Sequence, residues 1–181
     1  GKVLTLGLGM GYYAYMVAEK DEVEHVTIIE REQEVIDLFE SYILPQFSHP
    51  EKITVIKADA FEYLKFLDDG EFDYCFADIW IGSLEIEPYL TVKKLCKRFK
   101  KMKVEYWIEE ALSATIVQYV FSVIIMHFCE NQGIPRADFS TLSEDEVSGF
   151  NCVQSILENV EITRPEHIDY YMDFRNIVEL L

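Results

Sequence analysis

Short apolar runs alternate with longer helix-like segments over the first 130 residues of the chain. The runs at 3–6, 26–30, 53–58, 72–77 and 104–108 are rich in β-branched and aromatic residues, which predicts five buried strands. Between them, apolar residues recur at three- and four-residue spacing over 12–19, 32–43, 60–67 and 88–102, which predicts helices. This alternation is typical of an α/β fold, a three-layer sandwich with a mostly parallel sheet.

Residues 111–129 carry no charged side chain, which meets the length criterion for a membrane-spanning helix. Gln118 and His127 interrupt this stretch, and acids flank it at Glu109, Glu110 and Glu130, where basic residues usually stand at a membrane. A helix that packs on a sheet gives the same pattern. We therefore expect a buried helix, or one shared with a partner subunit, and no membrane.

The pattern weakens after Asn131. Residues 131–150 resemble a loop that contains a helix start at 143–146, residues 151–160 and 166–181 are helix-like, and 160–163 is a weak strand. No final hairpin is recognisable. We expect one domain over 1–181, with a core at 2–130 and a helical C-terminal part at 131–181. The chain opens at Gly1 directly on a strand, which suggests an N-terminally trimmed fragment that lacks an upstream segment.

Composition narrows the function classes. The net charge is −17, from 33 acidic and 16 basic residues, which opposes tight binding to bare nucleic acid. Seven of those basic residues fall within 93–103. This pattern predicts the solvated face of a basic helix, and the alternative is a binding surface for an anionic partner such as RNA. The four cysteines and four histidines show no metal-ligand spacing, so we expect no metal site. With no signal peptide, a cytoplasmic protein with reduced thiols is expected.

The first predicted strand runs into a loop with glycine at Gly7, Gly9 and Gly11, followed at once by a helix. Glycine permits positive φ and a close approach of a ligand to the backbone, and the helix N-terminus favours negative ligand groups. The loop does not distinguish between nucleotide ligands. One reading frame fits the G-x-G-x-x-A form of the dinucleotide fingerprint, with Ala14 at its last position.

Acids end the next three predicted strands. Glu30 can accept hydrogen bonds from ribose hydroxyls, in either NAD or S-adenosylmethionine. Asp59 can accept from an adenine amino group while the N–H of Ala60 donates to the ring; it also suits the N-cap of the following helix. Asp78 ends the fourth strand. Because ligands of open parallel sheets bind at the carboxyl ends of the strands, these acids should share one crevice with the glycine loop.

Four stretches, VLTLGLGMGYYA, VTIIERE, ITVIKADAFEYL and FDYCFADIW, resemble motifs I to IV of class I S-adenosylmethionine-dependent methyltransferases, and their spermidine-synthase-like branch most of all. The resemblance covers about residues 2–110. It implies strand order 3-2-1-4-5 and S-adenosylmethionine as cofactor. By that likeness the three glycines would underlie the cofactor's ribose and methionine part, Glu30 would hold the ribose, Asp59 and Ala60 the adenine, and Asp78 would lie beside the methionine end and act as base or orienter.

Two departures from the aminopropyltransferase pattern stand out. Met10 occupies a loop position where those enzymes carry an acid, and the acidic run that follows their fourth strand is replaced here by residues 79–83. Trp80 and Tyr89 could form a wall of the acceptor pocket, or simply belong to the core.

Three functions from different classes remain. The first is an S-adenosylmethionine-dependent methyltransferase of unknown acceptor, which could form a homodimer. The second is an aminopropyltransferase that uses decarboxylated S-adenosylmethionine. The third is a non-catalytic binding or dimerisation module; a dinucleotide-dependent reductase ranks last.

Overall fold

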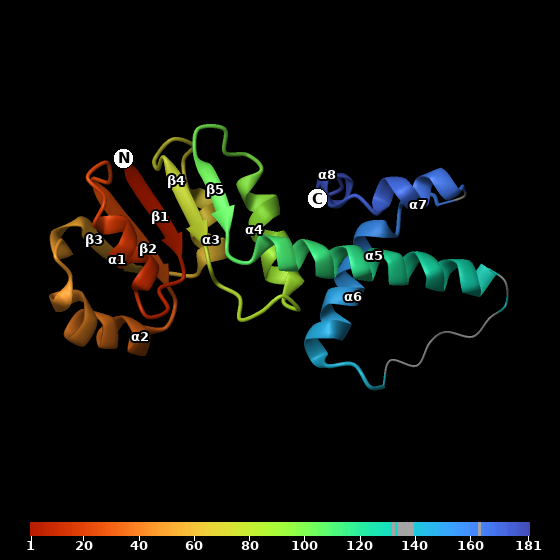
Figure 1. The fold of residues 1–181 in the computed structure, drawn as a ribbon, viewed down its shortest axis with the longest axis horizontal. Coiled ribbons are helices and arrows are strands. Elements are labelled where there is room, and N and C mark those ends of the chain that lie inside the picture. Colours follow the sequence, from red (N-terminus) through yellow and green to blue (C-terminus); the bar gives the residue numbers. More distant parts are fainter. Residues whose placement is uncertain (132, 134–139, 163) are drawn as a thin grey trace. The chain divides into compact units, whose positions relative to one another are not determined.

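The computed structural model of the chain describes residues 1–131, 133, 140–162 and 164–181 (Figure 1). Five parallel strands form one sheet in the order β3-β2-β1-β4-β5, as expected. The strands are β1 Lys2–Leu6, β2 His25–Glu30, β3 Ile53–Lys57, β4 Tyr74–Ala77 and β5 Lys103–Tyr106. The order reverses at β1, whose neighbours are β2 and β4, so the switch point lies at the carboxyl end of β1.

Helices α1 Tyr12–Ala18 and α2 Gln33–Leu38 connect the strands on one side of the switch point, and α3 Ala60–Phe66 leads back across it. Parallel crossovers are right-handed, so a reversal of direction places α3 on the opposite face from α1 and α2 (Figure 1). Both faces of β1 and β2 are therefore covered. This explains why these strands read as continuous apolar runs rather than as alternating patterns.

Beneath α1, the core contains side chains from three elements. Ala14 and Val17 of α1 pack with Val26 and Ile28 of β2 and with Phe39, which follows α2. Phe39 is fully buried and begins a π-helical turn at Phe39–Ile43. The helix predicted at 32–43 is thus present, although its last turn widens.

Contacts group the chain into two compact units. The first comprises Gly1–Ile79 and Thr91–Trp107 and contains the sheet; the second comprises Trp80–Leu90 and Ile108–Leu181. Helix α4 Ile86–Cys96 contributes residues to both. A single domain over 1–181 stays a prediction.

The second unit is built on α5 Glu109–Asn131 and α6 Glu144–Leu157, with α7 Pro165–Tyr171 and α8 Phe174–Glu179. The two long helices approach closely at Gly149, where a Cβ atom would meet the Tyr119 ring at 2.9 Å. Ser143 begins α6 with a capping box, since its hydroxyl accepts from the N–H of Glu146 while the Glu146 carboxylate accepts from the N–H of Ser143.

Helix α5 is only partly buried. Its inner face, with Leu112, Ile116 and Val120, is fully buried, whereas Phe121 and Phe128 are 49% and 62% exposed. By length and composition alone the segment Glu109–Glu130 could cross a membrane, and 22% of its most apolar window is buried. The predicted buried helix is thus buried along its inner face and exposed along its outer face, and sharing of α5 with a partner subunit stays a prediction.

Three element boundaries differ from expectation. The helix predicted at 88–102 ends at Cys96, because the Asp69 carboxylate accepts the N–H groups of Lys100 and Lys101 and holds them in a turn. The helix predicted at 151–160 is the second half of α6, which begins at Glu144. Residues 160–162 form no strand; Thr163, the last residue of that prediction, lies outside the described residues.

Candidate cofactor-binding site

The loop between β1 and α1 requires glycine at three positions, for two different reasons. Gly7, Gly9 and Gly11 have φ of 92°, 51° and 75°, all in the left-handed region. A Cβ at Gly7 would overlap the carbonyl oxygen of Asp78, and one at Gly11 would overlap the ring of Phe39. Gly9, in contrast, has no atom within 4 Å of such a Cβ. Packing therefore explains the outer glycines, while Gly9 leaves the backbone open to a ligand.

The Glu30 carboxylate fastens this loop to the end of β2. Its Oε2 accepts the N–H of Leu8 at 3.1 Å, and its Oε1 accepts those of Arg31 and Glu32 at 2.8 and 2.9 Å. Because each carboxylate oxygen can accept about two hydrogen bonds, Oε2 retains room for one more donor, such as a ribose hydroxyl.

Asp59 caps α3, which was one of the two roles expected for it. Its Oδ1 accepts the N–H groups of Phe61 and Glu62 at 2.9 and 3.0 Å. Among the described residues Oδ2 has no donor, and the N–H of Ala60, at the first position of the helix, has no intrahelical acceptor. The cap therefore leaves both groups available that would bind adenine, and that second role stays a prediction.

The backbone ladder brings these acids to one edge of the sheet. The N–H of Ala58 donates to the Glu30 carbonyl oxygen at 3.0 Å, which holds the end of β3 beside that of β2. The N–H of Asp78 donates to the Leu6 carbonyl oxygen at 2.9 Å, which holds the end of β4 beside the glycine loop.

Asp78 has the most unusual surroundings of the three acids. No described residue donates a hydrogen bond to its carboxyl group or forms an ion pair with it, and burial raises the pKa of this group above its ordinary value of 3.8. An unpaired, partly desolvated carboxyl group at a strand end is typical of a functional position rather than of a stabilising one.

Beneath the glycine loop lies a cavity of about 250 Å³. Its lining comes entirely from the first unit and comprises Thr5, Gly7, Leu8, Gly9, Met10, Tyr12, Tyr13, Ala14, Ile28, Phe76, Asp78 and Trp107. Of the adjacent tyrosines, Tyr12 is exposed, whereas Tyr13 stacks on Phe76 with ring centroids 4.0 Å apart.

Trp80 and Tyr89, predicted as acceptor-pocket walls, do not line this cavity. Both are buried in the second unit, where their rings meet edge-to-face at 5.5 Å and the Tyr89 hydroxyl donates to Glu109 at 2.8 Å. The structure thus favours the core interpretation of the two residues. Trp107, which sequence reasoning missed, lines the cavity instead. Its only signal was its place at the end of the fifth predicted strand.

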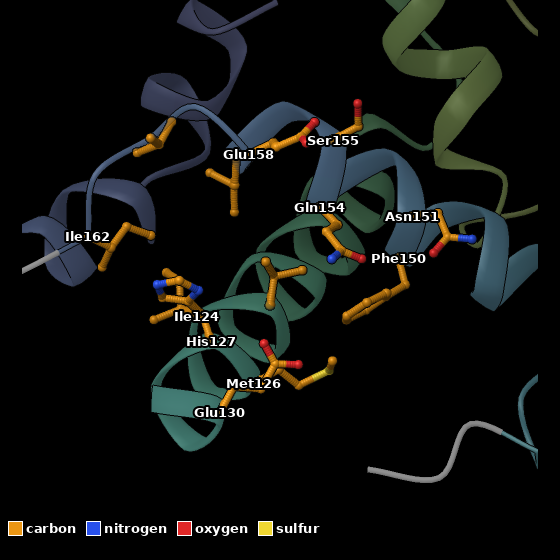
Figure 2. Close-up of a pocket in the computed structure, with 13 residues that line it drawn as sticks. Ile124, Met126, His127, Glu130, Phe150, Asn151, Gln154, Ser155, Glu158 and Ile162 are labelled. Atoms are coloured by element: carbon orange, nitrogen blue, oxygen red, sulfur yellow. The ribbon is translucent and has the colours of Figure 1, made fainter. Parts of the chain in front are cut away.

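A second cavity, of about 400 Å³, lies within the second unit between α5 and α6. Figure 2 shows Ile124 and Phe150 facing it, with polar groups such as Gln154 and Glu158 around them. Across the described ranges, no group of three or more His, Cys, Asp or Glu side chains could hold a metal ion.

Comparison with known protein families matches residues 1–119 to the spermine/spermidine synthase domain. The chain belongs to this family. The spermine/spermidine synthase match confirms the resemblance drawn from the four motifs and places the chain in the superfamily of S-adenosylmethionine-dependent transferases. It covers every residue that lines the glycine-loop cavity and none that lines the cavity between α5 and α6.

Two solved structures are similar to this spermidine-synthase-like chain. The crystal structure of spermidine synthase from Thermotoga maritima shares 25% identity, with a TM-score of 0.41 over 56% of this chain and 34% of that one. The structure of PigF with SAH shares 14% identity, with a TM-score of 0.42 over 84% and 44%. The chain therefore spans less than half the length of either. No curated protein matches it.

Proposed function

We propose that the glycine-loop cavity binds S-adenosylmethionine and that the chain is a methyltransferase for an acceptor still to be identified. One observation carries the proposal: four adjacent strand ends bring the glycine loop, Glu30, Asp59 and Asp78 to a single edge of the sheet. In open parallel sheets ligands bind at this edge, beside the switch point.

The residues present suit this cofactor. Gly7, Gly9 and Asp78 line the cavity itself, whereas Gly11, Glu30, Asp59 and Ala60 lie outside its lining, on the loop and the strand ends of the same sheet edge. Gly9 leaves the loop backbone accessible, Glu30 can accept one ribose hydroxyl, and Asp59 with the N–H of Ala60 offers an acceptor beside a donor, as an adenine edge requires. The bound cofactor would supply an electrophilic methyl group on a sulfonium. The chain's own task is then mainly to align donor and acceptor and to exclude water.

Asp78 is the candidate for orienting the acceptor or removing its proton. Its carboxyl group lines the cavity without a partner among the described residues. Because burial raises its pKa above the ordinary value of 3.8, the Asp78 carboxylate is a stronger base than an exposed aspartate.

Family membership makes aminopropyl transfer the second candidate. A decarboxylated cofactor and an amine acceptor together carry several positive groups, which need several acids to hold them. The cavity lining contains a single acid, Asp78, and Met10 stands where aminopropyltransferases carry another. This favours methyl transfer. A non-catalytic binding or dimerisation module would predict no group transfer from this cofactor.

Isothermal titration calorimetry distinguishes these proposed functions. The chain is titrated separately with S-adenosylmethionine, S-adenosylhomocysteine, decarboxylated S-adenosylmethionine and NADH. Binding of the first two supports the proposal, binding of the third in preference to the first supports aminopropyl transfer, and binding of NADH alone supports a reductase. No heat from any of the four would refute every enzymatic reading.

Two substitutions at Asp59 separate its two roles. Asp59→Ala removes both the helix cap and the proposed acceptor for adenine. It should therefore lower stability by about 1 kcal/mol and weaken S-adenosylhomocysteine binding. Asp59→Asn keeps the cap, because asparagine caps equally well, but its second atom becomes an amide that cannot accept from adenine. We expect unchanged stability and about tenfold weaker binding for the asparagine variant. Unchanged binding would mean that Asp59 is only a cap.

A further inference from the structure

The glycine-loop cavity has the composition of a site for an organic cation. Four aromatic residues line it, namely Tyr12, Tyr13, Phe76 and Trp107, and Asp78 supplies one carboxyl group. Among its described lining residues there is no lysine, arginine or histidine. Aromatic faces carry negative partial charge and attract cations, most strongly when the ring is tryptophan. The aromatic rings and the single carboxyl group of the lining therefore both favour a positively charged ligand.

Trp107 is the aromatic residue best placed for this role. Its N–H donates to the Ala77 carbonyl oxygen at 2.9 Å, which extends the β4–β5 ladder one residue beyond Tyr106. Asp78 follows Ala77 directly, so the ladder holds Trp107 beside the strand end that carries the carboxyl group. Trp107 is 37% exposed and lines the cavity, so part of its side chain is accessible to a ligand there.

We propose that Trp107 determines ligand specificity at this site: its indole face, together with the Asp78 carboxylate, makes the cavity prefer a sulfonium over the corresponding neutral thioether. The inference rests on the proposed function, since it concerns the same cavity. During transfer the carbon–sulfur bond to the methyl group breaks and its electron pair stays on sulfur, while the acceptor gains the methyl group and loses a proton. The product thioether is neutral, so the cation preference is lost with the reaction and product release becomes easier.

The test compares two ligands across three proteins. Dissociation constants for S-adenosylmethionine and S-adenosylhomocysteine are measured by calorimetry for the wild-type chain, Trp107→Phe and Trp107→Leu. We expect the preference for the sulfonium to fall by about threefold to thirtyfold in the leucine variant, the range of a cation–π contact, and to be largely kept by phenylalanine. Affinity for the neutral thioether should change less.

Each other outcome has a definite meaning. Equal weakening of both ligands in Trp107→Leu would overturn the inference while leaving the proposed function intact, because the ring would then only pack on the adenosyl group. A wild-type chain that binds neither ligand would overturn the proposed function and the inference with it. In a last experiment, putrescine is titrated into the chain with S-adenosylhomocysteine present. If putrescine binds to wild type but not to Trp107→Leu, the indole face contacts an ammonium group of the acceptor. That result would overturn the proposal that it contacts the sulfonium.

Tryptophan fluorescence gives a readout that needs no change at Trp107. The chain has two tryptophans, and Trp80 is buried in the second unit. In a Trp80→Phe variant the emission comes from Trp107 alone. We expect S-adenosylmethionine to change this emission more than S-adenosylhomocysteine does. An emission that neither ligand alters, under conditions where calorimetry shows binding, would place Trp107 away from the ligand.

Discussion

At the scale of single residues, Asp78 shows a conflict between stability and binding. Burial raises its pKa above 3.8, so the fold favours the protonated form. Its contribution to stability is fully present below the unfolded-state pKa and is lost as the pH rises through the raised folded-state value. Above that folded-state pKa the ionised carboxylate therefore destabilises the protein without ligand. A bound cation would reverse this cost.

Asp78→Asn tests both parts of this conflict. We expect the variant to be more stable than wild type at pH 7, with the difference shrinking as the pH falls toward 4, because there the wild-type carboxyl group becomes neutral too. Chemical denaturation at several pH values measures this. Calorimetry of the same variant should show weaker S-adenosylmethionine binding. A variant less stable than wild type at pH 7 would show that the carboxylate has a stabilising partner.

The two tryptophans show what residue type alone could not predict. Trp80 follows an acid at a strand end, which made it a predicted pocket residue, whereas Trp107 lies near the end of a strand-like run and was not predicted to line a pocket. The structure buries Trp80 against Tyr89 and leaves Trp107 at the cavity. Which side chain faces the cavity depends on the register of β4 with β5 and on the direction the chain takes afterwards, and neither is visible in a single sequence.

At the scale of elements, the turn between β1 and α1 offers a matched pair of substitutions. Gly7→Ala would drive a Cβ into the Asp78 carbonyl oxygen at a φ of 92°, so we expect strong destabilisation or misfolding. Gly9→Ala meets no atom within 4 Å, so it should cost only about 1–2 kcal/mol for the left-handed conformation. Because the new methyl group stands where a ligand would approach, this variant should nevertheless bind S-adenosylmethionine more weakly.

Thermal unfolding and calorimetry of both variants check this expectation. Gly82→Ala is a suitable control, because Gly82 also has no atom within 4 Å of a Cβ but does not line the cavity. If Gly9→Ala bound as tightly as the control, Gly9 would serve only the turn.

The elements were predictable where local pattern and tertiary packing agree. The five strands and α1 to α3 follow apolar runs and turn residues, and the structure confirms the strand order. The end of α4 was not predictable, because it depends on the Asp69 carboxylate about 30 residues earlier. Helix α5 is apolar on all sides, so its sequence has no polar face to indicate which side packs on α6.

At the scale of the whole molecule, charge is the dominant feature. Part of the basic cluster at 93–103 has a structural use: Arg98 donates to the carbonyl oxygens of Leu64 and Leu67 at the end of α3, and the ammonium of Lys93 lies 4.5 Å from the centre of the Tyr106 ring. These contacts agree with the interpretation of the cluster as a solvated structural surface, and an anionic partner stays a prediction. The whole chain still carries a net charge of −17, so its acidic side chains repel one another.

Self-repulsion of this size should make stability depend on salt. The Debye length falls from about 30 Å at about 0.01 M salt to about 8 Å at about 0.15 M, so added salt screens repulsion across the molecule. The ion pairs of the described residues, such as Lys65–Glu62, involve exposed side chains and contribute little that screening could remove. We therefore expect the thermal midpoint to rise over this range at pH 7. Near the isoelectric point of about 4.5 the net charge vanishes and the rise should disappear. A midpoint that falls with salt at pH 7 would show that local attractions outweigh the net charge.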